Sequence, residues 1–262
     1  MRSTSLTLRR EAFLLVFLLV VMTVGAIFDV MLDGGVIVVS LDIGLLFAVL
    51  GLMFPWAVWR GERPFDVSPL WLLPIHRRTA ALARTMAGGL WLVVICQSIF
   101  IWYAGLAIIS GGGFPTHEVR YLVTSGGALQ RISWTPEVWQ WLTVFAAPLV
   151  TYLFASAALL SLRYPIRWLA GGLIATLILA IVAPNGFMES VIERLMLGPL
   201  GFDHVLTGGR EDIEMLVRLP TGETGVAWRR LPDAERWLAA LAAWLGLALA
   251  ALVAAASRSR RL

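Results

Sequence analysis

The residue types that support catalysis or metal binding are sparse in this 262-residue sequence and lie far apart in it. His76, His117 and His204 have no second histidine or cysteine at a metal-ligand spacing, and Cys96 is the single cysteine. There is no G-x-x-x-x-G-K-S/T phosphate-binding loop and no G-x-S-x-G nucleophile elbow. We therefore expect no enzymatic activity, no metal and no cofactor in this chain itself.

Asp42 is the ionisable residue whose position most strongly suggests a function. It lies six residues into an apolar stretch, beside Ser40, at a depth of about 9 Å if the stretch is helical. Ionisable side chains within apolar spans line a polar path or pair with a neighbouring helix. Structural pairing is the commoner role, so a place on a transport path is the bolder of two open interpretations.

Six apolar runs provide the framework that would position these residues. A membrane-spanning helix needs about 20 residues, and the runs cover 13–32, 36–59, 79–109, 139–162, 168–183 and 237–255. Hydrophobic residues make up 59% of the chain and charged residues 15%, against roughly 45–50% and 25% in soluble domains. The sequence therefore predicts an all-α polytopic membrane protein, a single six-helix transmembrane domain over 1–262.

The distribution of arginine sets the expected orientation, because short cytoplasmic loops of membrane proteins are enriched in basic residues. All 21 basic residues are arginine, and they concentrate in the short segments 60–78 and 163–167 and near both chain termini. Both termini are therefore expected in the cytoplasm. Arg9 and Arg10 also resemble the start of a cleavable signal peptide, but the apolar stretch reaches Leu32, which favours an uncleaved span.

The segment 60–78 is the part of the sequence that hydropathy explains least. Pro64 and Pro69 interrupt regular helix, and an apolar stretch too short to cross a membrane then precedes a basic cluster. One interpretation, which composition alone favours, is an interfacial stop with aromatic rings among headgroups and arginines on phosphates. The other is a docking surface for a cytoplasmic partner, formed by Leu70, Trp71, Leu72, Leu73, Pro74, Arg77 and Arg78.

This segment resembles the cytoplasmic loop of ABC-2 type transporter permeases, in which an L-L-P-x-x-R-R phrase joins spans two and three. The phrase is formed here by Leu72, Leu73, Pro74, Arg77 and Arg78. The resemblance implies a coupling helix that docks on a separate ATP-binding cassette subunit, where ATP is hydrolysed. It also implies a second permease copy or a paralogue as partner. The family's usual elbow helix before span one has no full-length counterpart in residues 1–10.

The function that this resemblance implies is movement of a substrate across a bacterial inner (cytoplasmic) membrane, with membrane lipids as further neighbours. A nucleic-acid partner is not expected, because the arginines are scattered along membrane edges and form no patch. A different class of function stays open: a structural or accessory subunit of a larger membrane complex, with no transport activity. A membrane-embedded enzyme is the weakest interpretation, because acid, base and nucleophile are not arranged in the sequence.

The segments expected on the outer side carry local structure of their own. Residues 187–197 have an apolar stripe at helical period, which predicts a short amphipathic helix at the outer leaflet. The stretches 215–219 and 225–231 flank a Pro-Thr-Gly-Glu-Thr turn and predict a small β-hairpin. The glycine-rich segment 110–137 is expected to be a flexible linker. Trp59, at the close of the second run, is expected at headgroup level.

Overall fold

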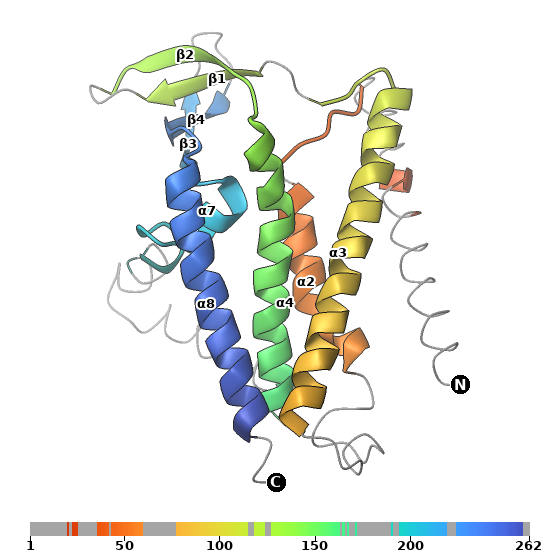
Figure 1. The fold of residues 1–262 in the computed structure, drawn as a ribbon. Coiled ribbons are helices and arrows are strands. Elements are labelled where there is room, and N and C mark those ends of the chain that lie inside the picture. Colours follow the sequence, from red (N-terminus) through yellow and green to blue (C-terminus); the bar gives the residue numbers. More distant parts are fainter. Residues whose placement is uncertain are drawn as a thin grey trace.

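The computed structural model describes residues 20, 23–25, 36–41, 43–59, 77–114, 118–123, 127–162, 164–165, 167, 171, 190, 194–218 and 224–258. Over these ranges the chain is mostly helical. Long helices lie side by side, a β-sheet covers one end of them, and the short helix α7 packs beside α8 (Figure 1). The elements are α2 (Ile43–Val58), α3 (Arg77–Ile109), β1 (Glu118–Val123), β2 (Leu129–Trp134), the 3-10 helix η2 (Val138–Leu142), α4 (Thr143–Ser161), α7 (Phe202–Thr207), β3 (Glu211–Arg218), β4 (Thr224–Arg230) and α8 (Ala234–Arg258).

Three of the predicted spans are present as helices long and apolar enough to cross a membrane. They cover Arg78–Ile109, Val138–Ser161 and Ala234–Ser257, close to the predicted 79–109, 139–162 and 237–255. The predicted spans 13–32 and 168–183 fall almost entirely outside the described residues. The six-span count is therefore not supported by the described part of the chain, which contains three membrane-length helices and one shorter apolar helix.

The shorter helix is α2, and it begins seven residues later than the predicted run 36–59. The preceding residues are extended because their backbone bonds to the turn after α3: Val39 N donates to Gly113 O at 3.0 Å, and Ile37 N donates to Ser110 Oγ at 3.0 Å. The side chains of Ile37 and Val39 are nevertheless buried, which explains why hydropathy did not separate this segment from the helix.

Helices α2 and α4 make a close crossing at Gly51. A Cβ added there would overlap the Pro148 carbonyl oxygen and the Thr151 hydroxyl of α4. At the same level, Thr151 Oγ1 donates a hydrogen bond to Ala48 O of α2 at 2.8 Å. Gly51, which has no side chain, lets the two backbones approach, and the Thr151 hydroxyl bonds across the gap between them. Small residues and polar side chains promote the association of apolar helices in this way.

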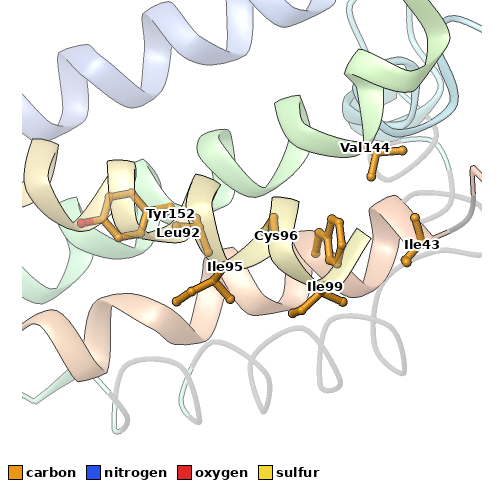
Figure 2. Packing of buried hydrophobic residues seen from close by; sticks show 8 residues of the cluster. Ile43, Leu92, Ile95, Cys96, Ile99, Val144 and Tyr152 are labelled. Carbon is orange, nitrogen blue, oxygen red and sulfur yellow. The ribbon is translucent and has the colours of Figure 1, made fainter. Parts of the chain in front are cut away.

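Apolar side chains from α2, α3 and α4 form a continuous cluster along this crossing (Figure 2). It extends from Ile43 and Val144 at one end to Leu92 and Tyr152 at the other. Cys96 lies within it and is only 1% exposed, so the single cysteine is a small buried apolar residue.

A four-stranded sheet with the order β2-β1-β4-β3 covers the far end of the bundle (Figure 1). The predicted hairpin is confirmed as β3 and β4, although β3 begins earlier, at Glu211. The prediction of a flexible linker at 110–137 is wrong, because β1 and β2 pair over Glu118–Val123 and Leu129–Trp134. A parallel contact between Leu122 and Trp228 joins the two hairpins. The fold is therefore mostly helical but departs from the all-α class.

The segment that follows the predicted amphipathic helix returns toward the bundle beside α8. Most of 187–197 lies outside the described residues, and within it Ser190 and residues 194–196 are helical. Further on, Trp244 Nε1 of α8 donates a hydrogen bond to Leu200 O at 2.8 Å, and the rings of Phe202 and Trp244 lie 5.3 Å apart. These contacts hold α7, which the sequence did not predict, against α8.

Candidate functional site

The predicted docking surface is only partly described. Leu70, Trp71, Leu72, Leu73 and Pro74 lie outside the described residues, as does the predicted pathway residue Asp42. Arg77 begins α3, and Arg78 is half-buried in its first turn. The structure therefore shows the two helices, α2 and α3, that the loop 60–76 connects. The contacts between the end of α2 and the start of α3 are the described part of the candidate site.

Arg84 binds the end of α2 from the second turn of α3. Its Nε and Nη2 atoms both donate to the carbonyl oxygen of Val58, at 2.8 and 2.5 Å. The last carbonyls of a helix have no partner within the helix and carry partial negative charge, so a guanidinium both satisfies and neutralises this one. Bonds from a charged donor are the stronger class of hydrogen bond. Arg84 thereby joins the two flanks of the loop.

Trp59, the last described residue before the loop, completes this arrangement. Its backbone N–H continues α2 by donating to Pro55 O at 2.8 Å, and the Arg84 guanidinium lies 5.5 Å from the centre of its ring. The Trp59 side chain is only 1% exposed, so its ring packs among helices and does not face the headgroups directly, as the predicted interfacial anchor would. We refer to Val58, Trp59 and Arg84 together as the loop anchor.

The loop anchor lies where four helices converge. Trp59 packs in a buried cluster with residues from the start of α3 and from the ends of α4 and α8: Ala81, Ala157, Leu159, Leu160, Leu252, Ala255 and Ala256. In Figure 1, α3 and α8 approach each other at this end and separate toward the sheet. Trp59 therefore joins the end of α2 to the start of α3 and to the ends of α4 and α8.

A second polar contact joins the loop anchor to α4. The residue after Arg84, Thr85, is fully buried and accepts a hydrogen bond at its backbone carbonyl from the Tyr152 hydroxyl, at 2.8 Å. Figure 2 shows Tyr152 at the end of the apolar cluster. Gly88, one turn along α3, makes room for it, because a Cβ there would overlap the Tyr152 oxygen. The loop is thus connected through α2 and α3 to α4.

Two features of the sequence were compatible with this contact between α3 and α4, although hydropathy does not measure either of them. Tyr152 is a lone tyrosine within a predicted span, and a phenolic hydroxyl in apolar surroundings requires a partner. The Gly88-Gly89 pair occurs in the adjacent span, where glycine permits close approach. Neither feature indicates which residue is the partner, so the hydrogen bond between Tyr152 and Thr85 could be recognised only in the structure.

The described residues contain no group of three or more histidine, cysteine or acidic side chains that could hold a metal ion. Comparison with known proteins finds no matching protein family, no matching curated protein and no matching solved structure. What the chain does must therefore be inferred from its own residues: the loop phrase, the apolar helices and the contacts that connect them.

Proposed function

We propose that the chain is the permease subunit of an ABC-2 type transporter in a bacterial inner membrane. It would have six spans and cytoplasmic termini, pair with a second permease copy or a paralogue, and use ATP hydrolysed by a separate ATP-binding cassette subunit. The observation that carries the proposal is the double hydrogen bond from Arg84 to Val58 O, because it ties both flanks of the ABC-2-like loop into one unit.

In this proposal the loop transmits motion and performs no chemistry. ATP-driven closure of the partner subunits would push the segment that contains Leu70 to Arg78. The loop anchor would pass the displacement to α2 and α3 together, and the bond between Tyr152 and Thr85 would pass it to α4. Rigid elements that share buried polar contacts move as one body, which is the property that a coupling element needs.

The placement of the arginines supports the orientation. The end of α2, the start of α3 and the ends of α4 and α8 lie at one end of the bundle, and the sheet lies at the other (Figure 1). The arginine-rich segments 60–78 and 163–167 and the stretch after α8 all adjoin that first end. By the positive-inside rule it faces the cytoplasm, so the sheet belongs outside.

This orientation predicts the outcome of cysteine labelling. In a Cys96→Ala background, Ser133→Cys on the exposed strand β2 should react with a membrane-impermeant maleimide in spheroplasts. Ser161→Cys, at the end of α4, should react only after the membrane is permeabilised. The reverse pattern would overturn both the orientation and the cytoplasmic docking of the loop.

The function is tested by the partner that the chain retains in its own membrane. A tagged chain purified from native membranes should bring with it a protein that has Walker A and signature motifs and hydrolyses ATP. Trp71→Ala should weaken this assembly by about 2 kcal/mol or more, because a few aromatic anchors dominate most interfaces. Trp91→Ala is the matched control, since Trp91 lies exposed on the middle of α3, away from the loop.

One outcome would overturn the proposed function, and a second would overturn only the docking role of the loop. If the wild-type chain brings no such ATPase, the accessory-subunit interpretation replaces the transporter. If the ATPase is present but is retained in full by Trp71→Ala, the transporter interpretation survives and the loop is reduced to a membrane-surface anchor.

A further inference from the structure

An open groove runs along α8, on the half of the helix nearer the sheet. Its volume is about 570 Å³, within the range typical of ligand sites. The described residues that line it are Arg194, Leu195, Pro199, Leu200 and Trp244. In Figure 1 the segment that precedes α7 lies beside this half of α8. We refer to the hollow between this segment and α8 as the α8 groove.

The walls of the α8 groove are apolar. The side chains of Leu195 and Leu200 are each more than half exposed. The indole N–H of Trp244 already donates to Leu200 O at 2.8 Å, so the Trp244 ring offers apolar surface to the groove. Lipid chains are as apolar as leucine side chains, so contact between the two is favourable in a membrane. The walls of the groove therefore suit a hydrocarbon chain.

Arg194 adds a single charge to this apolar surface. Its side chain is exposed and makes no hydrogen bond or ion pair with any other described residue. No acidic side chain is among the described residues of the lining, so none of them neutralises the guanidinium. A guanidinium binds a phosphate or a carboxylate through two parallel hydrogen bonds. The ligand of this groove should therefore carry an anionic group of that kind.

The level of the groove along α8 gives a reason for the anion. Trp244 lies ten residues after Ala234, where α8 begins, which is about 15 Å along the helix axis. Helix α8 is long and apolar enough to cross a membrane, and the hydrocarbon layer is about 30 Å thick. The groove therefore lies within that layer. A charged side chain there is unfavourable unless it reaches the interface or meets a counter-charge.

We propose that the α8 groove binds a phospholipid with an anionic headgroup. The Arg194 guanidinium holds the phosphate, and one acyl chain lies along Leu195, Leu200 and the ring of Trp244. A headgroup that carries its own cation, as in phosphatidylcholine, binds less tightly, because the described lining has no acidic side chain to receive that cation. This binding needs no ATPase partner, so it stands or falls separately from the proposed transport function.

Photo-crosslinking from an acyl chain tests the site directly. The chain is placed in phosphatidylcholine vesicles that contain a small fraction of phosphatidylglycerol with a diazirine in one acyl chain. Labelling is then located by mass spectrometry of the tryptic peptide 237–258, which contains Trp244. Phosphatidylglycerol should label Trp244 and its neighbours about fivefold more than phosphatidylcholine with the same photoactive chain, the preference expected from one basic residue.

Arg194→Gln removes the charge from the groove. It should lower labelling by phosphatidylglycerol to the phosphatidylcholine level, because the preference comes from that charge alone. Arg131→Gln is the matched control: it makes the same change at an exposed position on β2 and should leave labelling unchanged. If Arg194→Gln does not fold, Leu195→Asn decides. That variant places an amide against the acyl chain and should lower labelling about fivefold.

Competition distinguishes a bound lipid from a bound free phosphate. Excess dioleoyl phosphatidylglycerol should abolish the labelling, whereas glycerol 3-phosphate at millimolar concentration should have no effect, because it lacks the acyl chains. Displacement by glycerol 3-phosphate would overturn the lipid as the ligand. Equal labelling by the two photoactive lipids would show only the lipid that surrounds any membrane protein, and would overturn the site. Unchanged labelling of the folded variant would overturn it as well.

Discussion

Replacing Arg84 with methionine is expected to lower the free energy of unfolding of the purified chain by about 2 kcal/mol. The change removes both hydrogen bonds to Val58 O, and bonds from charged donors contribute about 1.5–3 kcal/mol. It also leaves the end of α2 without its cation. Methionine keeps an apolar stem of similar length, so packing beside Trp59 changes little. Thermal unfolding in detergent, followed by fluorescence-detected size exclusion, measures the effect.

A conservative variant separates positioning of the loop from general stability. Arg84→Lys retains the charge and one donor but not the planar fork, so its stability should lie between those of the wild type and Arg84→Met. The ATPase that co-purifies should follow the same order, because the loop is held by the same contact. Arg131→Met, on the exposed face of β2, should change stability by less than about 0.5 kcal/mol. Wild-type melting of Arg84→Met would refute the loop anchor.

The parts of the fold that the sequence predicted are those in which one local property decides the structure. Long apolar runs give α3, α4 with η2, and α8, because their length and lack of charge leave a helix as the favoured state in an apolar medium. The hairpin of β3 and β4 was predicted from two strand-like stretches around a turn that contains proline and glycine. In both cases all the necessary information lies within about 30 consecutive residues.

The errors arose where distant residues decide local structure. Ile37 and Val39 are extended because their backbone N–H groups donate hydrogen bonds to Ser110 and Gly113, more than 70 positions away in the sequence. The strands β1 and β2 were hidden by the glycines that flank them, and a parallel contact from β4 completes their sheet. No periodicity within 36–41 or 118–134 carries that information.

In the candidate site, too, local sequence identified a segment, whereas its contacts depend on residues that are distant in the sequence. The L-L-P-x-x-R-R phrase identified the loop, but it contains nothing about how the loop is held. Trp59 illustrates this point: its place at the end of an apolar run is typical of an interfacial anchor, yet the convergence of four helices buries it.

The second large effect is expected at the crossing of α2 and α4. Gly51→Ala should destabilise the chain by about 1–3 kcal/mol, although alanine is ordinarily the better helix former by about 1 kcal/mol. The reason is steric: the new methyl group would overlap Pro148 O and Thr151 Oγ1, so the helices must separate. Separation would also lengthen the bond from Thr151 Oγ1 to Ala48 O, now 2.8 Å.

The same substitution elsewhere in the bundle provides the control and makes the sign of the effect decisive. Among the described residues outside its own stretch of α3, no atom lies within 4 Å of the position that a Cβ at Gly105 would occupy. Gly105→Ala should therefore stabilise the chain by about 0.5–1 kcal/mol through helix propensity alone. Thermal unfolding of the two variants under one condition should shift in opposite directions. If both shift upward, the backbones of α2 and α4 are not held together by Gly51.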